Sequence, residues 1–391
     1  MAGQPLTVAQ IDSLEAVSAP AWNALIRDGN PFLTHEFLAA LERHGCVGAR
    51  WGWFPEHLIV LERRAEGDVL VGATPRYRKT NSYGELVFDH AWADAYHRHG
   101  LPYFPKQVIA VPYTPATGQR LLAEDTPSGR EAVQALIDHA LTDARAQAVS
   151  SQHWLFVNEE DRRNLESRGL FSRVGCQFHW HNRGWPDFAA FLESLASKKR
   201  KNIRRERRLV REAGVELDLR HGGEMSDRDW AVFYGFYRAT FARKGGYPTL
   251  SLGFFREIGR TLPEQVIVVS ARRRGETIAG SLMFRGEDAL YGRHWGALES
   301  VDGLHFEACY YQGLEYCLRH GLRRFEPGAQ GEFKISRGFL PQKTWSCHWL
   351  AHPKFHAAIE RHNAHEGEWV DEYMQDLGEH SPYKRSDAAS P

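Results

Sequence analysis

Two stretches of the sequence repeat one layout at widely separated positions. Residues 58–78, LIVLERRAEGDVLVGATPRYR, read as two apolar strands on either side of a polar turn that contains Gly67. Residues 266–285, VIVVSARRRGETIAGSLMFR, repeat this layout with Gly275 at the turn. Both stretches are typical of β-hairpins. An internal repeat with so long a period indicates that one architecture occurs twice in the chain.

The elements expected after each hairpin have the same order in both halves. They are a strand at 108–112, a helix at 129–146 and a strand at 154–157 in the first half, and a strand at 289–295, a helix at 304–320 and a strand at 323–326 in the second. An antiparallel meander followed by a strand-bounded helix predicts a mixed sheet covered by helices. The expected fold class is therefore α/β (α+β), with a mixed, mostly antiparallel sheet flanked by helices in each half.

The length of the chain, 391 residues, favours two domains over one. We expect an N-terminal domain over 1–177 and a C-terminal domain over 178–380, followed by a disordered tail over 381–391. The second domain should begin with helices near 187–196 and 198–213. A strand at 344–350 and a helix at 355–377 should close it.

Composition excludes several classes of protein. The formal net charge is zero, so affinity for nucleic acid or for an anionic membrane must come from a local patch. The five cysteines are scattered, without a CxxC pair, which argues against a disulfide scaffold and a zinc ribbon. No signal-peptide pattern or membrane-spanning run is present. We therefore expect a cytoplasmic protein without a membrane span.

The densest charge feature is the stretch SKKRKNIRRERRLVREAG, which a helix of residues 198–213 would carry. Like charges at this spacing repel one another, and a polyanion would relieve the repulsion. The phosphates of a tRNA or of a nucleotide-linked substrate are the expected ligands, bound by Arg200, Arg204 and Arg205. The alternative is a solvated helix that Glu206 and Glu212 partly neutralise.

A glycine-rich segment, EPGAQGEFKISRGFLP, follows the strand expected at 323–326. Gly328 and Gly331 would let the backbone approach a ligand closely, and Lys334 and Arg337 would supply cationic donors. Acyl transfer passes through a tetrahedral oxyanion that a fixed lysine can stabilise. The alternative is that the glycines only form tight turns.

Residues 78–100, RKTNSYGELVFDHAWADAYHRHG, are expected to form a long binding loop, since such loops often carry function. The alternative is that its aromatic side chains belong to the core. The candidate ligand-binding residues of this stretch are Lys79, Asn81, Tyr83, Glu85, Asp89, His90 and Trp92.

Two further polar groups lie at the ends of expected elements. Arg293, a candidate substrate-binding residue, and His294 end a strand, while His305 and Glu307 begin a helix. His294, His305 or Glu307 could act as a general base for an attacking amine if it lies within reach. The alternative for each is a structural role.

Other signals favour no further chemistry. Histidines 348, 352, 356, 362 and 365 recur without a cysteine or carboxylate motif, so we expect surface histidines and no metal site. A Walker loop, a GxSxG elbow and a GxGxxG motif after a strand are absent from the sequence. These absences argue against an ATPase, a serine hydrolase and a dinucleotide enzyme.

Several stretches together resemble those of one family. KTNSYGE, FDHAWADAY, KKRKNIRRER, LHFEACYYQGLEY and EPGAQGEFKISRGFLP look like signatures of the FemAB-like proteins. These are predicted N-acyltransferases of the GNAT superfamily, related to the Fem peptidyltransferases of peptidoglycan bridge synthesis. The resemblance covers nearly the whole chain. It implies two tandem GNAT-type domains and transfer from aminoacyl-tRNA to an amine on a nucleotide-linked or lipid-linked precursor.

The resemblance also implies roles for single residues. A motif of the family aligns with Phe333, Lys334 and Gly338, which would place Lys334 at the reacting carbonyl or phosphate. The basic helix of the family aligns with Arg200, Asn202 and Ile203.

The sequence departs from the peptidoglycan-bridge enzymes at two places. FLAALERHG has Leu41 and Glu42 where those enzymes carry a lysine, and LSLGFF has Leu250 and Phe254 where they carry an arginine and a tyrosine. These departures bear on recognition of a muramyl nucleotide, so they leave the acceptor open.

The prediction is an N-acyltransferase that moves an acyl or aminoacyl group to an amine on a cell-wall precursor or another peptide-like molecule. Aminoacyl-tRNA is the favoured donor, so tRNA is an expected partner, and no permanently bound cofactor is expected. One alternative is an acyl-CoA-dependent GNAT N-acetyltransferase, with acyl-CoA as the co-substrate. Another is a non-catalytic binding protein for RNA or a cell-wall precursor. The oligomeric state is left open.

Overall fold

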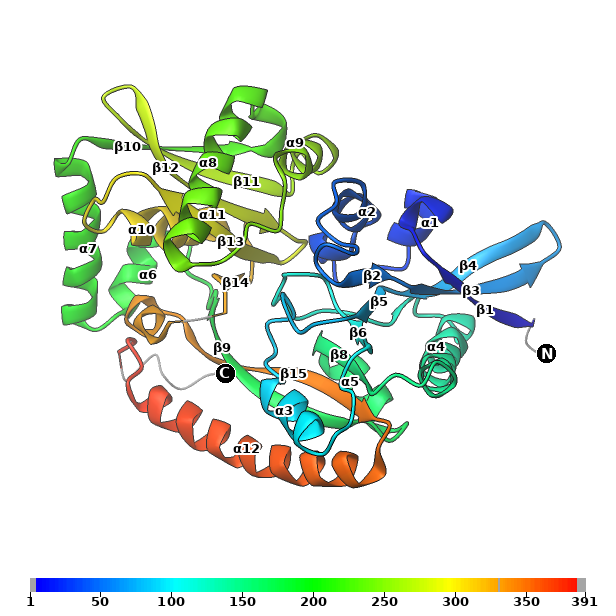
Figure 1. The fold of residues 1–391 in the computed structure, drawn as a ribbon. Helices are drawn as coiled ribbons and strands as arrows, with labels where there is room; N and C mark the ends of the chain where they lie inside the picture. Colours follow the sequence, from blue (N-terminus) through cyan, green and yellow to red (C-terminus); the bar gives the residue numbers. More distant parts are fainter. Residues whose placement is uncertain (1–4, 330, 385–391) are drawn as a thin grey trace. The chain divides into compact units, whose positions relative to one another are not determined.

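The computed structural model describes residues 5–329 and 331–384, which form two compact units (Figure 1). The first unit comprises Met1–Gly175 and Lys343–Asp371, and the second comprises Cys176–Gln342 and Glu372–Pro391. The chain passes between them within β9 (Phe171–His181), β15 (Leu340–Leu350) and α12 (Pro353–Glu379). The first unit thus takes in a segment from the end of the chain, and the domain bounds 1–177 and 178–380 stay a prediction.

The first hairpin is confirmed as β3 (His57–Arg64) and β4 (Gly67–Thr74) in the first unit. It lies in a sheet of order β1-β3-β4-β7, with β1 at Leu6–Ile11 and β7 at Leu122–Ala123. The apolar face of α4 (Pro127–Ala146) packs on this sheet. A Cβ atom at Gly72 would lie 2.9 Å from the Cβ of Ala132, so the glycine permits this close approach.

Other strands of the first unit follow the order β15-β8-β6-β5-β2. Their bounds are Ser151–Val157 for β8, Lys106–Ile109 for β6, Arg76–Lys79 for β5 and Trp53–Pro55 for β2. The pair β6 and β8 is parallel. The hairpin thus lies in one sheet of this unit and the strands β6 and β8 lie in another, a difference from the simple repeat that the sequence indicated.

The remaining helices of the first unit are α1 (Ala19–Asn23), α2 (His35–Arg43), α3 (His90–Arg98) and α5 (Glu159–Glu166). The prediction of a continuous loop over 78–100 is wrong, because α3 occupies its second half. This helix buries only Trp92 and Tyr96, one turn apart, which is too short an apolar stripe to stand out in the sequence.

The second unit contains the second hairpin, confirmed as β11 (Val266–Arg273) and β12 (Glu276–Arg285). Its strands follow the order β10-β11-β12-β13-β14-β9, with β10 at Val215–His221, β13 at Ala289–Ala297 and β14 at Arg324–Glu326. The pair β13 and β14 is parallel, and the other pairs with a known register are antiparallel. The strand β9 was not expected from the sequence.

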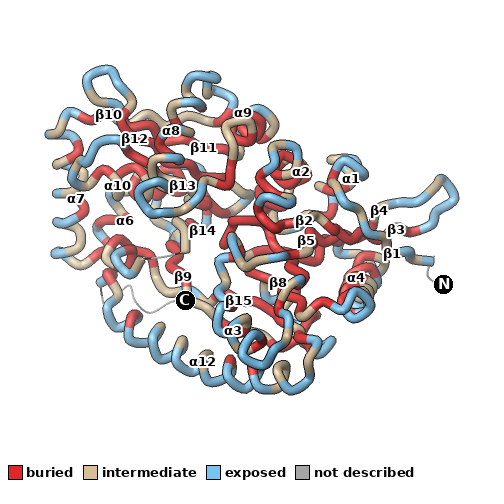
Figure 2. Tube along the Cα trace, viewed as in Figure 1, coloured by how far each residue is buried: buried red, intermediate tan, exposed pale blue. Residues whose placement is uncertain are grey.

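Helices cover both faces of this sheet, and Figure 2 shows its strands mostly buried. On one face lie α8 (Asp227–Lys244) and α9 (Leu252–Thr261). The rings of Phe233 and Phe236 in α8 lie next to Gly280, and the backbone of Phe236 lies next to Gly296. The other face carries α6 (Phe188–Ser194), α7 (Ser197–Glu212), α10 (Leu304–Phe306), the π-helical segment η4 (Glu307–Tyr311) and α11 (Gln312–Arg319). The predicted fold class is confirmed.

The end of the described chain packs into the second unit. Tyr383 is buried, stacks on Trp185 and donates a hydrogen bond to the carbonyl oxygen of Gly338 at 2.7 Å. Residues 381–384 are therefore ordered, contrary to the expected tail, while 385–391 lie outside the described residues. No helix within 5–329 and 331–384 is both long enough and apolar enough to cross a membrane.

Candidate functional site

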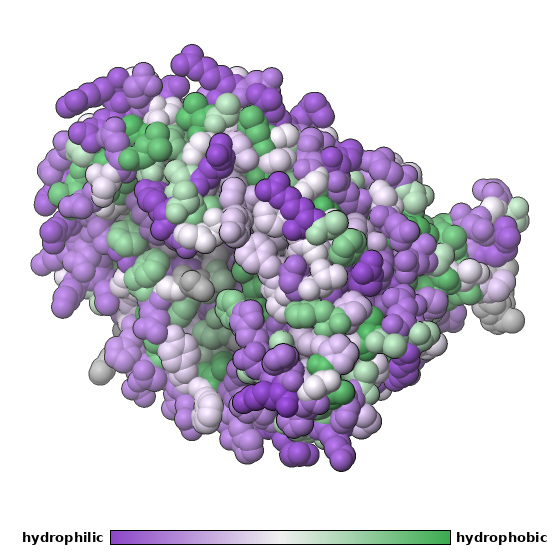
Figure 3. Space-filling model, in the orientation of Figure 1, coloured by the Kyte–Doolittle hydropathy of each residue, from purple (hydrophilic) through white to green (hydrophobic). Residues whose placement is uncertain are grey.

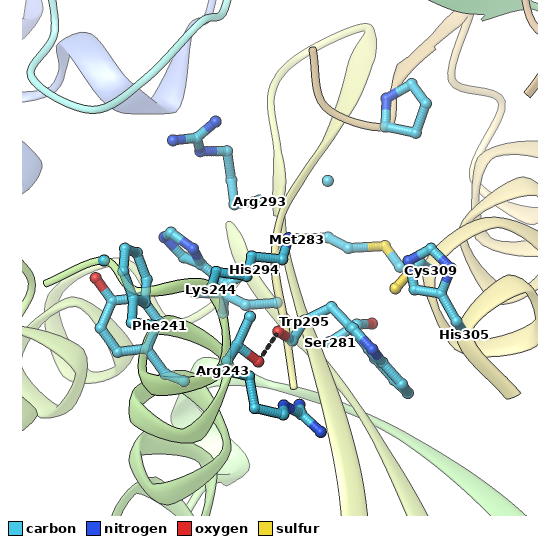
Figure 4. A pocket seen from close by; sticks show the side chains of 16 residues that line it. Phe241, Arg243, Lys244, Ser281, Met283, Arg293, His294, Trp295, His305 and Cys309 are labelled. Carbon is cyan, nitrogen blue, oxygen red and sulfur yellow. Dashed lines mark hydrogen bonds between the residues drawn. The ribbon is translucent and has the colours of Figure 1, made fainter. Parts of the chain in front are cut away.

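A cavity of about 610 Å³ opens in the second unit, and we call it the β13 cavity (Figure 4). Strands β12 and β13 line it, together with the C-terminal turns of α8, the π-helical segment and Pro327. The described lining side chains include cations and imidazoles but no carboxylate. They are Tyr237, Thr240, Phe241, Arg243, Lys244, Gly246, Ser281, Leu282, Met283, Gly292, Arg293, His294, Trp295, His305, Cys309 and Pro327.

The cavity lies where β13 and β14 separate. These parallel strands pair only between 289–291 and 324–326, whereas β13 continues to Ala297. Pro327 ends the short strand β14, and a Cβ atom at Gly292 would lie 3.1 Å from the Cα of Pro327. The two backbones thus meet closely at the fork, and β13 runs beyond it without β14 alongside.

A β-bulge places Arg293 in the cavity. Leu282 of β12 is opposite His294, and Met283 is opposite Gly292, so Arg293 is the extra residue of β13. Such bulges re-aim side chains and are common beside active sites. Burial lowers the pKa of Arg293 to about 10, against the opposing influence of Tyr237 and Glu326, and the guanidinium stays cationic near neutral pH.

The end of α8 brings two more cations to the cavity. This helix begins after Ser226, which forms a capping box with Asp229, and it ends at Gly245 in the left-handed conformation with φ 66°. Arg243 and Lys244 occupy its last turn and line the cavity. Sequence reasoning missed both, because basic residues before a glycine are typical of any helix C-terminus.

Two imidazoles line the cavity in their neutral form. His294 packs edge-on against Tyr237 at 5.0 Å, and His305 packs against Trp295 at 5.5 Å between ring centroids. Burial lowers the pKa of His294 to about 3 and that of His305 to about 4, and nearby cations act in the same direction. Near neutral pH each ring can therefore accept a hydrogen bond from an amine, but both are weak bases.

The short helix α10 and the π-helical segment after it place His305 and Cys309 on the side of the cavity away from α8 (Figure 4). Short π segments often occur at functional sites. Ser281 of β12 donates a hydrogen bond to the carbonyl oxygen of Ala308 at 2.9 Å and fixes the segment to the sheet. Burial raises the pKa of the Cys309 thiol, so the thiolate is disfavoured.

Lys334 is buried, but it is not among the residues that line the β13 cavity. Its Nζ donates a hydrogen bond to the carbonyl oxygen of Gly328 at 2.5 Å, which anchors the loop next to Pro327. Gly328 and Gly331 have φ values of 103° and 112°, which favour glycine. Burial lowers the Lys334 pKa to about 8. The contacts of Lys334 therefore suit a residue that positions the cavity wall.

Arg337 and Glu307 also lie outside the β13 cavity lining, and both are held in ion pairs. Arg337 donates to Glu206 at 2.6 Å and to the carbonyl oxygen of Phe333 at 2.8 Å. The carboxylate of Glu307 accepts two hydrogen bonds from Arg207, each at 3.0 Å. These pairs connect the glycine-rich segment and the π-helical segment to α7.

A second cavity of about 930 Å³ lies along α7, and we call it the α7 groove. It shares no described lining residue with the β13 cavity. Arg204 and Arg205 line the groove, whereas Arg200 forms an ion pair with Glu193 at 3.0 Å, as Arg204 also does. The candidates Arg293, His294 and His305 thus line one cavity, and Arg204, Arg205 and Glu307 line the other. Arg200, Lys334 and Arg337 line neither of the two.

The candidate residues of the first unit form a buried polar network rather than an open loop. Lys106, which sequence reasoning missed, donates hydrogen bonds to Glu85 at 2.7 Å and to Asp89. The Lys79 ammonium lies 4.0 Å from the centroid of the Trp53 ring. Burial lowers the pKa of Lys79 to about 7 and raises that of Glu85 to about 7.

Other candidates of the first unit have mixed positions. Asn81 accepts a hydrogen bond from Lys79 at 3.2 Å, Trp92 is in the core, and Tyr83 and His90 are exposed. The expectation that His348 is a surface histidine is wrong. It is 1% exposed and its Nδ1 lies 2.7 Å from the Nδ1 of His153 on the neighbouring strand, a non-local pairing that the sequence does not reveal.

Clusters of three or more histidine, cysteine or acidic side chains that could hold a metal ion are not found in the described part of the chain. The candidate ligand-binding sites described here are the two cavities of the second unit.

The described fold is similar to that of several solved structures. FemX is 12% identical and has a TM-score of 0.54, with 88% of this chain and 98% of that chain covered. The C-terminal domain of a putative lysylphosphatidylglycerol synthetase from Agrobacterium fabrum is 9% identical, with a TM-score of 0.52 and coverage of 87% and 94%. The L-PGS from Bacillus licheniformis is 11% identical, with a TM-score of 0.50 and coverage of 86% and 97%. At these identities the likeness shows the fold.

Sequence comparison gives the family. No curated protein sequence matches the chain. A sequence model of the FemAB-like family, described as peptidoglycan biosynthesis and recognition, matches residues 13–385. Since this match covers most of its length, the chain belongs to the FemAB-like family.

Proposed function

We propose that the protein is an aminoacyltransferase that uses the β13 cavity to join the activated carboxyl group of a donor to an amine. The observation that carries the proposal is the lining of the cavity by Arg293 and Lys244 beside two neutral imidazoles, with no carboxylate among its described residues. Membership of a family described by peptidoglycan biosynthesis supports an amine on a cell-wall precursor as acceptor. The fold shared with FemX and with a putative lysylphosphatidylglycerol synthetase supports aminoacyl transfer.

The reaction needs no covalent intermediate on the protein. The amine nitrogen attacks the donor carbonyl carbon, the new C–N bond forms, and the ester C–O bond breaks. The nitrogen loses one proton and the released hydroxyl oxygen gains one, so the step is balanced. A held amine gains rate from proximity to the carbonyl, and fixed cations stabilise the oxyanion that forms between attack and release.

The proposed roles follow from charge. Arg293 and Lys244 attract the anionic donor and stabilise the oxyanion. The neutral ring of His305 accepts a hydrogen bond from the attacking amine and orients its lone pair. Lys334 acts as a positioning residue through its hydrogen bond to Gly328, because its ammonium is directed at the protein backbone.

The separation of β13 from β14 suggests how the donor could bind. Past residue 291 the edge of β13 has no β14 beside it, and an extended ligand with amide groups could pair with such an edge. Aminoacyl-tRNA is the favoured donor because of the family. Acyl-CoA is the alternative donor, since its pantetheine arm carries amides that suit the same edge.

The direct test offers both donors to the purified protein. A tRNA pool charged with labelled amino acids and labelled acetyl-CoA are each incubated with peptidoglycan precursors, and amide products are identified by mass spectrometry. We expect a product from charged tRNA that requires the protein and Arg293. The variant Arg272→Met is a matched control, because Arg272 is exposed on β11 of the same unit.

The other two outcomes of this test would each favour a different function. If product forms only with acetyl-CoA, then acetyl-CoA is the donor in place of charged tRNA and the protein is an acyl-CoA-dependent acetyltransferase. Saturable binding of precursor or RNA, with no product from either donor, would favour a non-catalytic binding protein and overturn the proposed reaction.

A further inference from the structure

The cations of α7 form a continuous stripe on one side of the helix. Lys201, Arg204, Arg208 and Arg211 follow each other at spacings of three and four residues, which places them on one face. With a rise of 1.5 Å per residue, the stripe extends over about 15 Å. A row of this length faces several charges of one polymer more readily than a single phosphate.

Ion pairs divide these cations into two groups. Arg207 is paired with Glu307 and Glu315, Arg204 with Glu193, and Arg208 with Glu212. In contrast, Lys201, Arg205 and Arg211 are exposed and have no carboxylate partner within the described residues. The left edge of the space-filling view, where α7 runs, is hydrophilic (Figure 3). Positive charge is therefore available to a partner along the outer side of α7.

The N-terminal turn of α7 adds to this excess. It contains Lys198 and Lys199 and no acidic residue, and the helix has no side-chain cap. Cations at this end oppose the helix dipole, and an anion there would be favoured. The helix thus carries two unfavourable electrostatic features that one polyanionic partner would offset.

Apolar side chains share the lining of the α7 groove with the cations. They are Phe188, Leu192, Val210, Val215 and Leu217. The large exposed apolar side chains of the described chain are not among the residues that line the groove, and Ile203 and Val210 of α7 are each only 1% exposed. A helix that lies on a membrane exposes large apolar side chains for insertion, so the groove suits a lipid surface poorly.

We propose that the α7 groove binds the sugar-phosphate backbone of an RNA, with the body of a tRNA as the partner. This deepens the proposed function and rests on its choice of aminoacyl-tRNA as donor. The stripe Lys201, Arg204, Arg208 and Arg211 contacts successive phosphates, and Arg205 contacts the backbone from the side of the groove. Because the groove and the β13 cavity have separate linings, the RNA body and the reacting ester are held by different residues.

The test is the salt dependence of tRNA binding by the full chain. The triple variant Lys201→Ala, Arg205→Ala, Arg211→Ala is compared with the parent and with a control of equal charge change. That control is Arg228→Ala, Arg272→Ala, Arg319→Ala, three exposed cations of the same unit outside both cavities. Uncharged bulk tRNA is titrated at several salt concentrations, and thermal melting by circular dichroism verifies that each variant is folded.

We expect the groove variant to bind tRNA at least tenfold more weakly at moderate salt. The slope of log K against log salt should become shallower by about 2 to 3, since each lost phosphate contact contributes about 0.9. The control should bind within about twofold of the parent. Equal affinity of the groove variant and the parent, or an equal loss in the control, would overturn the proposal. If the triple variant does not fold, the single variant Arg205→Glu is titrated instead, and equal affinity of this variant and the parent would overturn the proposal.

Two further arms separate the partner from its competitors. Phosphatidylglycerol vesicles and inorganic pyrophosphate are titrated in place of tRNA, and binding of either through the groove in preference to tRNA would overturn the proposal. Groove-dependent tRNA binding without transfer from charged tRNA would count against the proposed reaction while supporting the RNA site. If the groove variant transfers from charged tRNA as fast as the parent does, the proposed reaction would be supported and the RNA site would be overturned.

Discussion

Arg207 of α7 holds both carboxylate oxygens of Glu307 in the π-helical segment, with its Nε and Nη2 each 3.0 Å from an oxygen. Glu307 is 4% exposed, and Arg207 also donates to Glu315 at 2.6 Å. Paired in this geometry, the guanidinium joins the basic helix to the wall that carries His305 and Cys309. The ion pair is therefore part of the support of the β13 cavity.

Loss of this guanidinium should destabilise the fold. Arg207→Met leaves the Glu307 carboxylate buried without its main partner, and we expect a loss of about 3 kcal/mol in the free energy of unfolding. Chemical denaturation measures this loss. Arg208→Met is the control, since Arg208 and its partner Glu212 are both exposed, and it should change stability by less than about 1 kcal/mol. Equal effects of the two substitutions would contradict the role of the Arg207 pair.

Removal of the bulged cation should impair transfer more than folding. Arg293→Met eliminates a charge that lines the β13 cavity, and we expect kcat/KM to fall by about 100-fold or more, as for loss of one oxyanion donor. Steady-state kinetics with charged tRNA measures this, and the thermal midpoint shows whether the fold is intact. Unchanged kinetics would remove Arg293 from the mechanism.

Lys334 should give stability a dependence on alkaline pH. Its pKa is lowered from 10.5 to about 8 by burial, so between these values the folded state binds fewer protons than the unfolded state. Stability then rises as pH increases from about 8 towards 10.5, by up to about 1.4 kcal/mol per pH unit. The measurement is the difference in unfolding free energy between the parent and Lys334→Met at several pH values. A difference that does not vary with pH would contradict the lowered pKa.

Because of how α8 packs on the sheet, substitution of two glycines by alanine should change the stability of the protein in opposite directions. A Cβ atom at Gly296 would lie 2.2 Å from the carbonyl oxygen of Phe236, so Gly296→Ala should cost at least about 2 kcal/mol. Gly235 of α8 has nothing within 4 Å of the added Cβ, and Gly235→Ala should stabilise by about 0.5 to 1 kcal/mol through helix propensity. Thermal unfolding of both variants checks this contrast.

The sequence predicted the elements that depend on local pattern. Both hairpins, with turns at Gly67 and Gly275, and the helices at 127–146 and 197–212 follow from alternation, periodicity and glycine placement. It did not predict α3, whose two buried aromatic residues stand among polar ones, or β9, whose burial is irregular. These two elements owe their stability to tertiary contacts that a local pattern does not contain.

Only the part of the candidate site that depends on local sequence could be predicted. Arg293, His294 and His305 were singled out as ends of expected elements, and they line one cavity, although β13 continues past the first two to Ala297. The fork between β13 and β14, the bulge at Arg293 and the approach of Lys244 depend on pairings between distant segments. Lys334 was chosen for its glycine neighbours, yet those glycines also let its ammonium reach a backbone carbonyl.

The separate linings of the β13 cavity and the α7 groove have an evolutionary consequence. Under the proposed function, substitutions at Lys201 or Arg205 would change which carrier brings the acyl group, while the residues around Arg293 and His305 stay as they are. A lineage with this division would then exchange its supply of activated carboxyl groups without rebuilding the place where the amide bond is proposed to form.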